Sequence, residues 1–357
     1  MTLLNAFSRL SRAGLAAMAL AGCGAALAAP LNVVTSFSIL QDITQQVGGP
    51  DVSVSTLVGR GGDAHVYEPR PADVRTLAGA QVLVVNGLEF ETWLPRLVQS
   101  SGFAGRTIVA TEGVTPLRFS HDGHAPAEQG RHDHGHKHDH DHKHDHDHKH
   151  DHAHGKSAAK HDHDHDHDHD HDHDDHHGHA HGEWDPHAWQ DPRQGVRYAL
   201  NIAEGLAAAD PANAEGYRQR AQAYAVKLQA LHQRLSTEFA ALPAERRRAL
   251  VSHEAFAYFG QAYGLDLLAV SGLSTQAEPS ASQMAGLIRQ VKQKQVPAVF
   301  VENVSSPRLV EQIARETGAK AGGTLYSDAL SEPGQPAATY LDLLEWNASR
   351  FLDALRP

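Results

Sequence analysis

The chain has 357 residues, 41% of them hydrophobic, a formal net charge of −12 and a single cysteine. This length suggests two domains. Most of the negative charge lies in one low-complexity segment, so the rest of the chain is close to neutral and its charge gives no indication of a nucleic-acid partner. No segment after the N-terminus is apolar over the roughly 20 residues that a membrane-spanning helix needs.

The N-terminus has the features of an export signal. A basic start is followed by residues 13–29, which are nearly all Ala, Leu and Gly and too few for a spanning helix. The run ends in the cleavage pattern Ala26-Leu27-Ala28, which predicts that residues 1–28 are removed. Leu20-Ala21-Gly22-Cys23 has the form of a bacterial lipobox, so Cys23 as a lipid-anchored N-terminus is the alternative. Either reading predicts a periplasmic location, free or anchored.

The first part of the mature chain alternates short apolar strands with helices. Such alternation is typical of βαβ units and a parallel sheet. It predicts an N-terminal α/β lobe made of residues 29–120 and 182–210. We expect strands at residues 31–35, 52–58, 82–85 and 107–110, and helices at residues 39–47, 71–80 and 90–100.

Residues 212–241 predict one long helix. They contain no proline and are rich in Ala, Gln, Leu and Arg; Asp210-Pro211 gives a start signal and Leu242-Pro243 a stop signal. At 1.5 Å per residue such a helix is roughly 45 Å long, about the diameter of a domain or more. We therefore expect a rigid linking helix over residues 211–243.

The alternation of strands and helices resumes after this helix and predicts a C-terminal α/β lobe over residues 244–357. The expected fold class is α/β, with two lobes of parallel β-sheet flanked by helices, joined by one long rigid helix, and a metal site in the cleft between them. We expect strands at residues 250–252, 265–270, 296–301 and 319–325, and helices at residues 254–263, 280–294, 307–317 and 340–355.

Residues 121–181 form a low-complexity segment that holds 25 of the 29 histidines, sixteen acidic residues and six basic ones. This composition cannot bury a core and predicts a disordered loop. Dense imidazoles offer many weak, interchangeable metal sites. We favour a tethered collector or buffer of zinc, because tethering gives a high effective concentration near the cleft. The alternative is a solvating loop with no metal function.

Only four histidines lie outside that segment, and three of them are expected in loops or at strand-to-helix junctions: His65, His187 and His253. Asp328 lies just beyond the last predicted strand. Ligands bind outside the carboxyl ends of parallel strands, so these loops are expected to converge between the lobes. Three imidazoles and one carboxylate form a closed four-coordinate set that suits Zn²⁺, whereas Mn²⁺ or Mg²⁺ calls for more oxygen.

The remaining polar residues near these positions have two readings. Asp63, Glu68, Glu183 and Asp185 either cap turns on a solvated surface or orient the imidazoles of the neighbouring ligands. His232, in the middle of the long helix, is expected at the surface. Because imidazoles lose protons when they bind zinc, we expect affinity to fall below about pH 6.

Several motifs resemble the metal-specific solute-binding proteins of ABC importers, the group that serves zinc and manganese uptake (cluster A-I). They run in family order over essentially the whole mature chain. They include Asp63-Ala64-His65-Val66-Tyr67-Glu68-Pro69, Val85-Asn86-Gly87-Leu88-Glu89, the run from Trp184 to Pro192, Ser252-His253-Glu254-Ala255-Phe256-Ala257-Tyr258-Phe259, and Tyr326-Ser327-Asp328.

The resemblance implies His65, His187, His253 and Asp328 as ligands of a Zn²⁺ ion that a monomer passes to a separate permease and ATPase. Manganese-type members carry Glu at the third ligand position, so His253 favours the zinc branch. The sequence departs from the family pattern in two ways. Its second lobe lacks the disulfide that some zinc-type relatives have, and Ala64 stands where some relatives have an acidic residue. The fourth ligand is therefore assigned to Asp328, ahead of Asp63 and Glu183.

Three other functions compete with zinc capture for transport. A zinc hydrolase would keep an open coordination position and a general base, and the pair His253-Glu254 lacks a second histidine four residues after the first. The absence of a nucleophile elbow or P-loop also argues against an enzyme. A metal-storage protein or metallochaperone based on the His-rich loop is the main alternative. A surface adhesin is a third class that the sequence leaves open.

Overall fold

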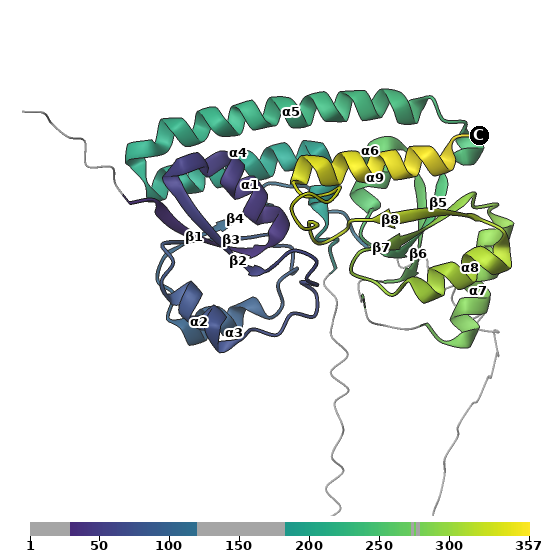
Figure 1. The fold of residues 1–357 in the computed structure, drawn as a ribbon, viewed down its shortest axis with the longest axis horizontal. Helices are drawn as coiled ribbons and strands as arrows, with labels where there is room; N and C mark the ends of the chain where they lie inside the picture. The colour runs from purple at the N-terminus through teal and green to yellow at the C-terminus, as the bar shows by residue number, and fades with distance from the viewer. Residues whose placement is uncertain (1–28, 120–182, 273–274, 276–278) are drawn as a thin grey trace, which may run out of the picture.

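A computed structural model describes residues 29–119, 183–272, 275 and 279–357. The predicted signal segment, Cys23 and the His-rich segment 121–181 lie outside the described residues. The described chain forms two lobes, each built on a four-stranded parallel sheet, and one long helix runs over both (Figure 1). Among the described helices, none is both long and apolar enough to cross a membrane.

The N-terminal lobe is a sheet of order β2-β1-β3-β4 with helices on both faces. Successive strand residues point to opposite faces. Val34 of the first strand therefore packs with Leu77 and Leu97 under α2 and α3, while Val33 belongs to the large core under α1 and α4. The strands are β1 (Leu31–Phe37), β2 (Val52–Val58), β3 (Val82–Val85) and β4 (Arg106–Val109), and the helices are α1 (Ser38–Gly48), α2 (Pro71–Ala78), α3 (Leu94–Ser101) and α4 (Pro192–Ala209).

The C-terminal lobe repeats this arrangement with strand order β6-β5-β7-β8. On one face Leu250 and Val299 pack against α7 and α8, and on the other Phe300 joins Phe259 and Phe351 under α6 and α9. The strands are β5 (Arg248–His253), β6 (Asp266–Ser271), β7 (Ala298–Glu302) and β8 (Lys320–Leu325), and the helices are α6 (Ala257–Tyr263), α7 (Ala281–Gln293), α8 (Pro307–Thr317) and α9 (Tyr340–Leu355).

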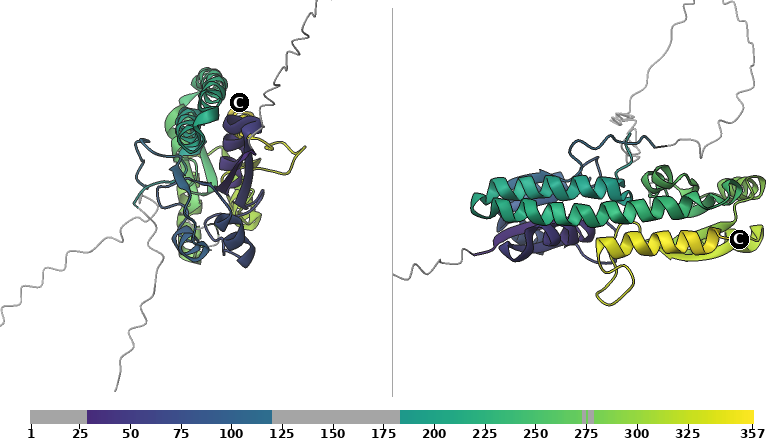
Figure 2. Two further views of the ribbon diagram at one scale, coloured as in Figure 1. Left: turned by 90° about the vertical axis from the view of Figure 1, so that its left-hand side faces the viewer. Right: turned by 90° about the horizontal axis from the view of Figure 1, so that it is seen from above.

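The linking helix α5 (Ala214–Ala240) has 27 residues, about 40 Å at 1.5 Å per residue. Seen from above, it spans the length of both lobes beside α4 and α9 (Figure 2). Its buried residues recur every three or four positions and belong to one core that extends from β1 to α9. Arg220 fixes one end through Val47 O and Asp51, and Arg234 contacts Glu345 near the other. The lobes are therefore held together by a shared hydrophobic core as well as by the covalent connection through α5.

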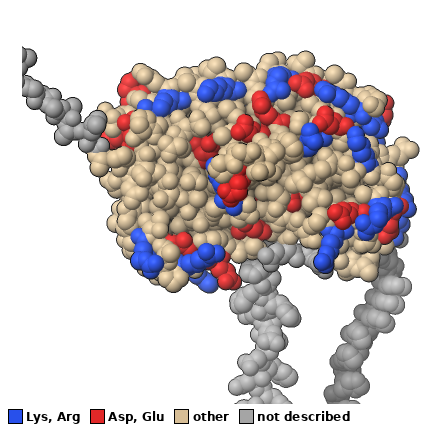
Figure 3. Space-filling view, in the orientation of Figure 1, with Lys and Arg blue, Asp and Glu red and all other residues tan. Residues whose placement is uncertain are grey.

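The outer surface of this helix carries charges of both signs. In Figure 3, Lys and Arg side chains follow the upper edge of the molecule with acidic side chains between them. Mixed charges of this kind create no extended field of one sign. This edge is therefore a solvated surface. The candidate ligand site is the space between the lobes.

Most predicted elements are confirmed, and three local differences have a physical explanation. Helix α4 was not predicted, although Asp191 caps it by accepting from Arg193 N and Pro192 opens it. Helix α3 begins at Leu94, not at residue 90, because the Glu91 carboxylate accepts from Asn86 N at 2.6 Å and closes a turn. Helix α6 begins at Ala257, after a turn that follows the end of β5.

Candidate metal centre

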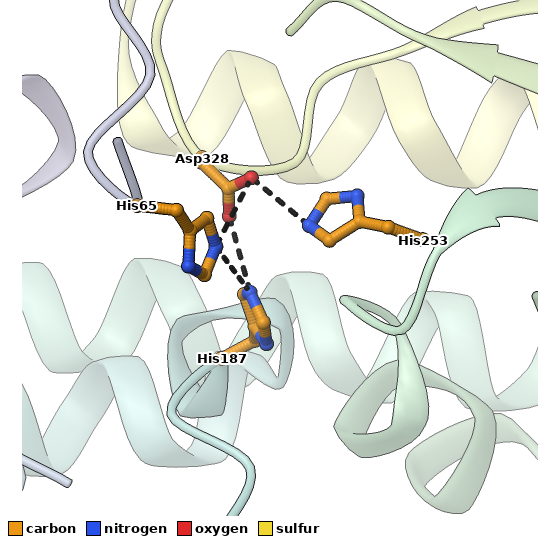
Figure 4. Close-up of side chains that lie close together, drawn as sticks. All are labelled: His65, His187, His253 and Asp328. Atoms are coloured by element: carbon orange, nitrogen blue, oxygen red, sulfur yellow. Dashed lines mark hydrogen bonds and ion pairs between the residues drawn. The ribbon is translucent and has the colours of Figure 1, made fainter. Parts of the chain in front are cut away.

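Four side chains from distant parts of the chain meet between the lobes: His65, His187, His253 and Asp328 (Figure 4). His65 lies in the loop after β2, and His187 directly precedes the short 3-10 helix η3 (Ala188–Gln190). His253 ends β5, and Asp328 follows β8. One possible ligand atom from each residue lies within 4.8 Å of the others. All four residues that were expected as ligands from the sequence therefore lie together in the structure.

The spacing of the ligand atoms fits one small cation. His65 Nε2 lies 3.3 Å from His187 Nε2, and His187 Nε2 lies 3.3 Å from Asp328 Oδ1. His253 Nε2 and His65 Nε2 are 3.1 and 3.8 Å from Asp328 Oδ2. Ligands about 2.0–2.1 Å from a tetrahedral Zn²⁺ lie about 3.3–3.4 Å from each other. Three of these distances, 3.1–3.3 Å, are close to the edges of such a tetrahedron, but they involve both oxygens of Asp328, and the four ligand atoms as a set lie within 4.8 Å of one another.

Burial supports the same conclusion. His187, His253 and Asp328 are fully buried, and the His65 side chain is 12% exposed. Among the described residues, His253 Nε2 and Asp328 Oδ1 are buried and lie within ion-pair distance of one another's groups, but neither makes a hydrogen bond in good geometry. A divalent cation bound by all four residues would give these atoms a directed partner, and nitrogen-rich four-coordination is what zinc prefers.

Two carboxylates orient the imidazoles of His187 and His253 by contacting the ring nitrogens that point away from the metal site. Asp185 Oδ1 lies 2.7 Å from His187 Nδ1 and also accepts from the His187 backbone N–H at 2.8 Å. Glu302 does the same for His253, with Oε2 2.5 Å from Nδ1 and Oε1 accepting from the backbone N–H at 2.9 Å. A carboxylate on Nδ1 fixes the ring and leaves Nε2 to face the metal. Both rings are therefore held in a ligating orientation.

The same carboxylates set the charge of the metal-free site. Burial alone would lower the pKa of His187, but Asp185 and Asp328 outweigh it and raise this pKa to about 9. Burial also acts to lower the pKa of His253, and Glu302 and Asp328 hold it well above its ordinary value. Burial would raise the pKa of Asp328, yet the two imidazoles keep it well below its usual range. Protons and a metal ion would therefore compete for these two imidazoles.

Replacing Glu302 with Gln keeps the size of the side chain and removes its charge. We expect Glu302→Gln to weaken zinc binding by about 10- to 100-fold, because the loss of a carboxylate behind a ligating imidazole typically has this effect. Competition with a chromogenic chelator measures the change. The exposed Glu345, which pairs with Arg234 far from the site, provides the control Glu345→Gln. Equal affinities for the two variants would contradict the role of Glu302.

The other polar residues singled out in the sequence have different positions. Asp63 Oδ1 accepts from His65 N at 2.9 Å, and burial raises its pKa. Glu183 pairs with Arg118 and Glu68 is exposed, so neither lies against the imidazoles. His232 is half-buried, with Nδ1 3.4 Å from the Tyr263 hydroxyl. His232 is therefore partly exposed, as a surface position implies, and partly covered by Tyr263 at the end of α6.

Sequence reasoning did not identify Glu302 as a partner of the site. Strand β5 pairs with β7 so that Leu250 lies beside Val299, and three residues further His253 reaches the level of Glu302. A carboxylate at the end of a buried strand, next to a strand that ends in a candidate ligand, was the available signal. Phe90, whose ring packs edge-on against His65 with centroids 4.9 Å apart, gave no comparable signal.

Two parallel-sheet lobes joined by a long helix, with a buried donor set between them, define the class of metal-binding solute-binding proteins. The family profile described as "Zinc-uptake complex component A periplasmic" matches residues 33–354. The chain belongs to this family. It is accordingly the metal-binding component of an ABC uptake system, acts outside the cytoplasm with a membrane permease and an ATPase, and is not an enzyme.

Similar proteins differ in the metal that their names state. The manganese-binding lipoprotein MntA of Halalkalibacterium halodurans is 29% identical over 95% of both chains. The iron-binding protein YfeA of Yersinia pestis is 28% identical over 88% of this chain and 82% of its own length. The periplasmic zinc-binding protein TroA of Treponema pallidum has a solved structure that is 25% identical, with a TM-score of 0.70 over 92% of this chain and 100% of TroA.

Proposed function

We propose that this protein captures Zn²⁺ with His65, His187, His253 and Asp328 and delivers it to the permease of a zinc importer. The observation that carries the proposal is a set of three imidazole nitrogens and one carboxylate that lie within 4.8 Å of one another in a buried site. Names within the family include manganese, iron and zinc, so the donor set supplies the argument for zinc. Nitrogen-rich tetrahedral sites favour Zn²⁺ over Mn²⁺, which prefers more oxygen ligands.

We further propose the division of the chain that the sequence suggests. An N-terminal lobe of residues 29–120 and 182–210 and a C-terminal lobe of residues 244–357 flank the linking region 211–243. The positions of α4, α5 and β5 support these boundaries. Export with removal of residues 1–28, or lipidation at Cys23, precedes function.

The His-rich segment 121–181 acts in this proposal as a weak zinc collector near the tight site. Deletion of residues 121–181 is expected to leave one tight zinc site per chain and to remove the weaker ones. Isothermal titration with zinc, and metal content after dialysis, measure both classes of site. The full-length chain is the reference, and its extra sites should saturate only at higher zinc concentration.

The alternative function, a metal-storage protein or metallochaperone based on the His-rich segment, makes the opposite prediction. In that case the deletion would remove all tight binding, and the four residues between the lobes would contribute nothing measurable. The same titration therefore separates the two functions.

His253 is the position at which the proposed selectivity can be changed. We expect His253→Glu to weaken zinc binding and strengthen manganese binding, so that the ratio of the two affinities falls by at least about tenfold, because an oxygen ligand replaces a nitrogen. Competitive titration with Zn²⁺ and Mn²⁺ measures the ratio. The variant His232→Glu, which alters a histidine away from the site, controls for a general effect of added charge. An unchanged ratio in His253→Glu would argue against a selectivity role.

A further inference from the structure

The carbonyl group just before each proposed ligand accepts a hydrogen bond from a side chain. Trp93 Nε1 donates to Ala64 O at 2.9 Å, and Asn86 Nδ2 donates to Pro186 O at 3.0 Å. Ahead of Asp328, Ser327 O accepts from Trp189 Nε1 at 2.9 Å and from Gln190 Nε2 at 2.8 Å. Ahead of His253, Ser252 O accepts from Ser271 Oγ at 3.1 Å. A bond at this position fixes the backbone from which the ligand side chain extends.

These donors divide unequally between the lobes. Trp93, Asn86, Trp189 and Gln190 all belong to the N-terminal lobe, although one of the carbonyls they bind precedes Asp328 of the C-terminal lobe. Ser271 lies at the end of β6 in the C-terminal lobe. Three ligands are therefore anchored from one lobe and the fourth from the other.

The segment after Asp328 is also bonded to the N-terminal lobe. Leu330 N donates to Ser38 Oγ and Leu330 O accepts from Gly61 N, both at 3.0 Å. Arg60 Nη1 donates to Ser331 O at 2.5 Å and to Ala338 O at 2.8 Å. On the other side, Asn303 contacts Ser327 N and Ala329 O at the longer distances of 3.2 and 3.3 Å. Asn347 of α9 holds Tyr326 N and O at 2.8 and 2.7 Å, so the C-terminal lobe fixes the chain before Asp328, whereas the N-terminal lobe binds Ser327 O and the chain after it.

His253 has the opposite surroundings. Its ring partner and backbone acceptor, Glu302, ends β7, and the donor to its preceding carbonyl, Ser271, ends β6. In Figure 4 His253 extends from β5 on one side of the site, His65 lies across from it, and Asp328 and His187 enter from above and below. Of the four side chains, His253 is the one whose backbone partners and ring-orienting carboxylate all lie in the C-terminal lobe.

We propose that the ligand set is divided three to one. His65, His187 and Asp328 form a preorganised receptor that takes the metal first, and His253 then completes the coordination and controls release. Trp93, Asn86, Trp189 and Gln190 are positioning residues of the receptor, and Ser271 is the positioning residue of His253. This inference rests on the proposed metal site. Preorganisation matters because ligands held in place avoid the cost of ordering them when the metal binds.

The division predicts different kinetic effects for the two kinds of positioning residue. Trp93→Phe removes one N–H donor, and we expect it to lower the zinc association rate by about threefold to tenfold, the range expected for one hydrogen bond. Ser271→Ala is expected to raise the dissociation rate by a similar factor and to leave association unchanged. Stopped-flow mixing of the full chain with zinc, and of the zinc complex with excess chelator, gives the two rates.

Matched controls lose the same type of bond elsewhere. Trp346 Nε1 donates to Thr324 O at 2.9 Å, on the strand before Asp328, and Ser349 Oγ donates to Trp346 O at 2.8 Å; neither acceptor directly precedes a proposed ligand. Trp346→Phe and Ser349→Ala should leave both rates unchanged. A general loss of packing would change the controls as well, so a purely structural effect would be recognised.

The ligands themselves provide the stronger test. His253→Ala is expected to bind zinc at a rate within about twofold of the unaltered chain and to release it more than 100-fold faster. His65→Ala and Asp328→Ala are expected to slow association by more than tenfold. If His253→Ala slows association as much as these two, the three-to-one division is wrong. If the unaltered chain binds no zinc tightly, the proposed metal site fails, and this outcome is distinct from equal effects of all four ligands.

Discussion

Asp328→Asn is expected to weaken zinc binding by far more than 100-fold, beyond the 10- to 100-fold typical of residues that only support a ligand. The carboxylate lies within 3.1–3.8 Å of the Nε2 atoms of His65, His187 and His253, so it is the one group that contacts all three imidazoles. It is also the only negative charge among the four proposed ligands. An amide of the same shape offers a neutral oxygen in its place.

Two measurements check this expectation. Chelator competition gives the affinity, and thermal unfolding with and without zinc gives the linked stabilisation. A ligand at 1,000 times its Kd stabilises a protein by about 4 kcal/mol, so the Tm of the unaltered chain should rise clearly on addition of zinc. The Tm of Asp328→Asn should rise little. The exposed Asp353, paired with Arg350, supplies the control Asp353→Asn, which should behave as the unaltered chain does.

Asp328→Asn should still fold without metal. In the metal-free site Asp328 faces imidazoles whose pKa values it helps to raise, and without it these imidazoles can lose their protons. The variant therefore avoids an unpaired buried charge, the situation that makes removal of one partner of a buried ion pair so destabilising. A zinc affinity equal to that of the unaltered chain would remove Asp328 from the ligand set.

The fold was predictable because its signals are local. The strands β2 and β3 and the helices α8 and α9 have the predicted bounds, since apolar runs, prolines and cap residues mark their ends in the sequence. The start of α3 was not predictable from local propensity. It depends on Glu91, whose carboxylate also accepts from Ser36 Oγ at 2.6 Å, and Ser36 lies 55 residues earlier in the chain.

The four proposed ligands were predictable for a different reason. Parallel strands place their carboxyl ends at one edge, and His65, His253 and Asp328 lie at or after such ends, whereas His187 precedes η3 and was selected from its loop and from the family resemblance. What supports the ligands was much less visible. The bond from Trp189 to Ser327 O joins residues 138 positions apart, and nothing in either local sequence indicates it. The proposed division of the ligands between the lobes depends on such long-range contacts, so it could not be predicted from local sequence.

The zinc affinity is expected to rise steeply with pH between about 6.5 and 9. In the metal-free site the pKa of His187 is raised to about 9 and that of His253 is higher than its ordinary value, because Asp185, Glu302 and Asp328 outweigh the effect of burial. Zinc binds the neutral imidazole, so it displaces these protons. Each displaced proton changes the apparent Kd by about tenfold per pH unit below the pKa. The carboxylates thus move the loss of affinity upward from the value near pH 6 that the sequence alone suggests.

The stability of the metal-free protein should change in the opposite direction. A histidine with a raised pKa contributes stability that is fully present below its unfolded pKa of about 6.5 and is lost as the pH rises through the folded value. Asp328, with a lowered pKa, contributes stability above its unfolded pKa of about 3.9, and this part is lost on acidification. The metal-free chain should therefore be less stable at pH 9 than at pH 7.

Calorimetric titration in buffers of different ionisation enthalpy counts the protons that zinc releases, and we expect between one and two at pH 8. In Asp185→Asn the imidazole of His187 loses the carboxylate that raises its pKa most. The number of protons released at pH 8 should therefore fall by about one, while the proton released from His253 remains. Proton release that is zero at pH 8 in the unaltered chain, with a Kd independent of pH from 6.5 to 9, would show that the imidazoles are already neutral. In that case the carboxylates would orient the rings without charging them, and the protons could not act as the competitor that zinc must displace.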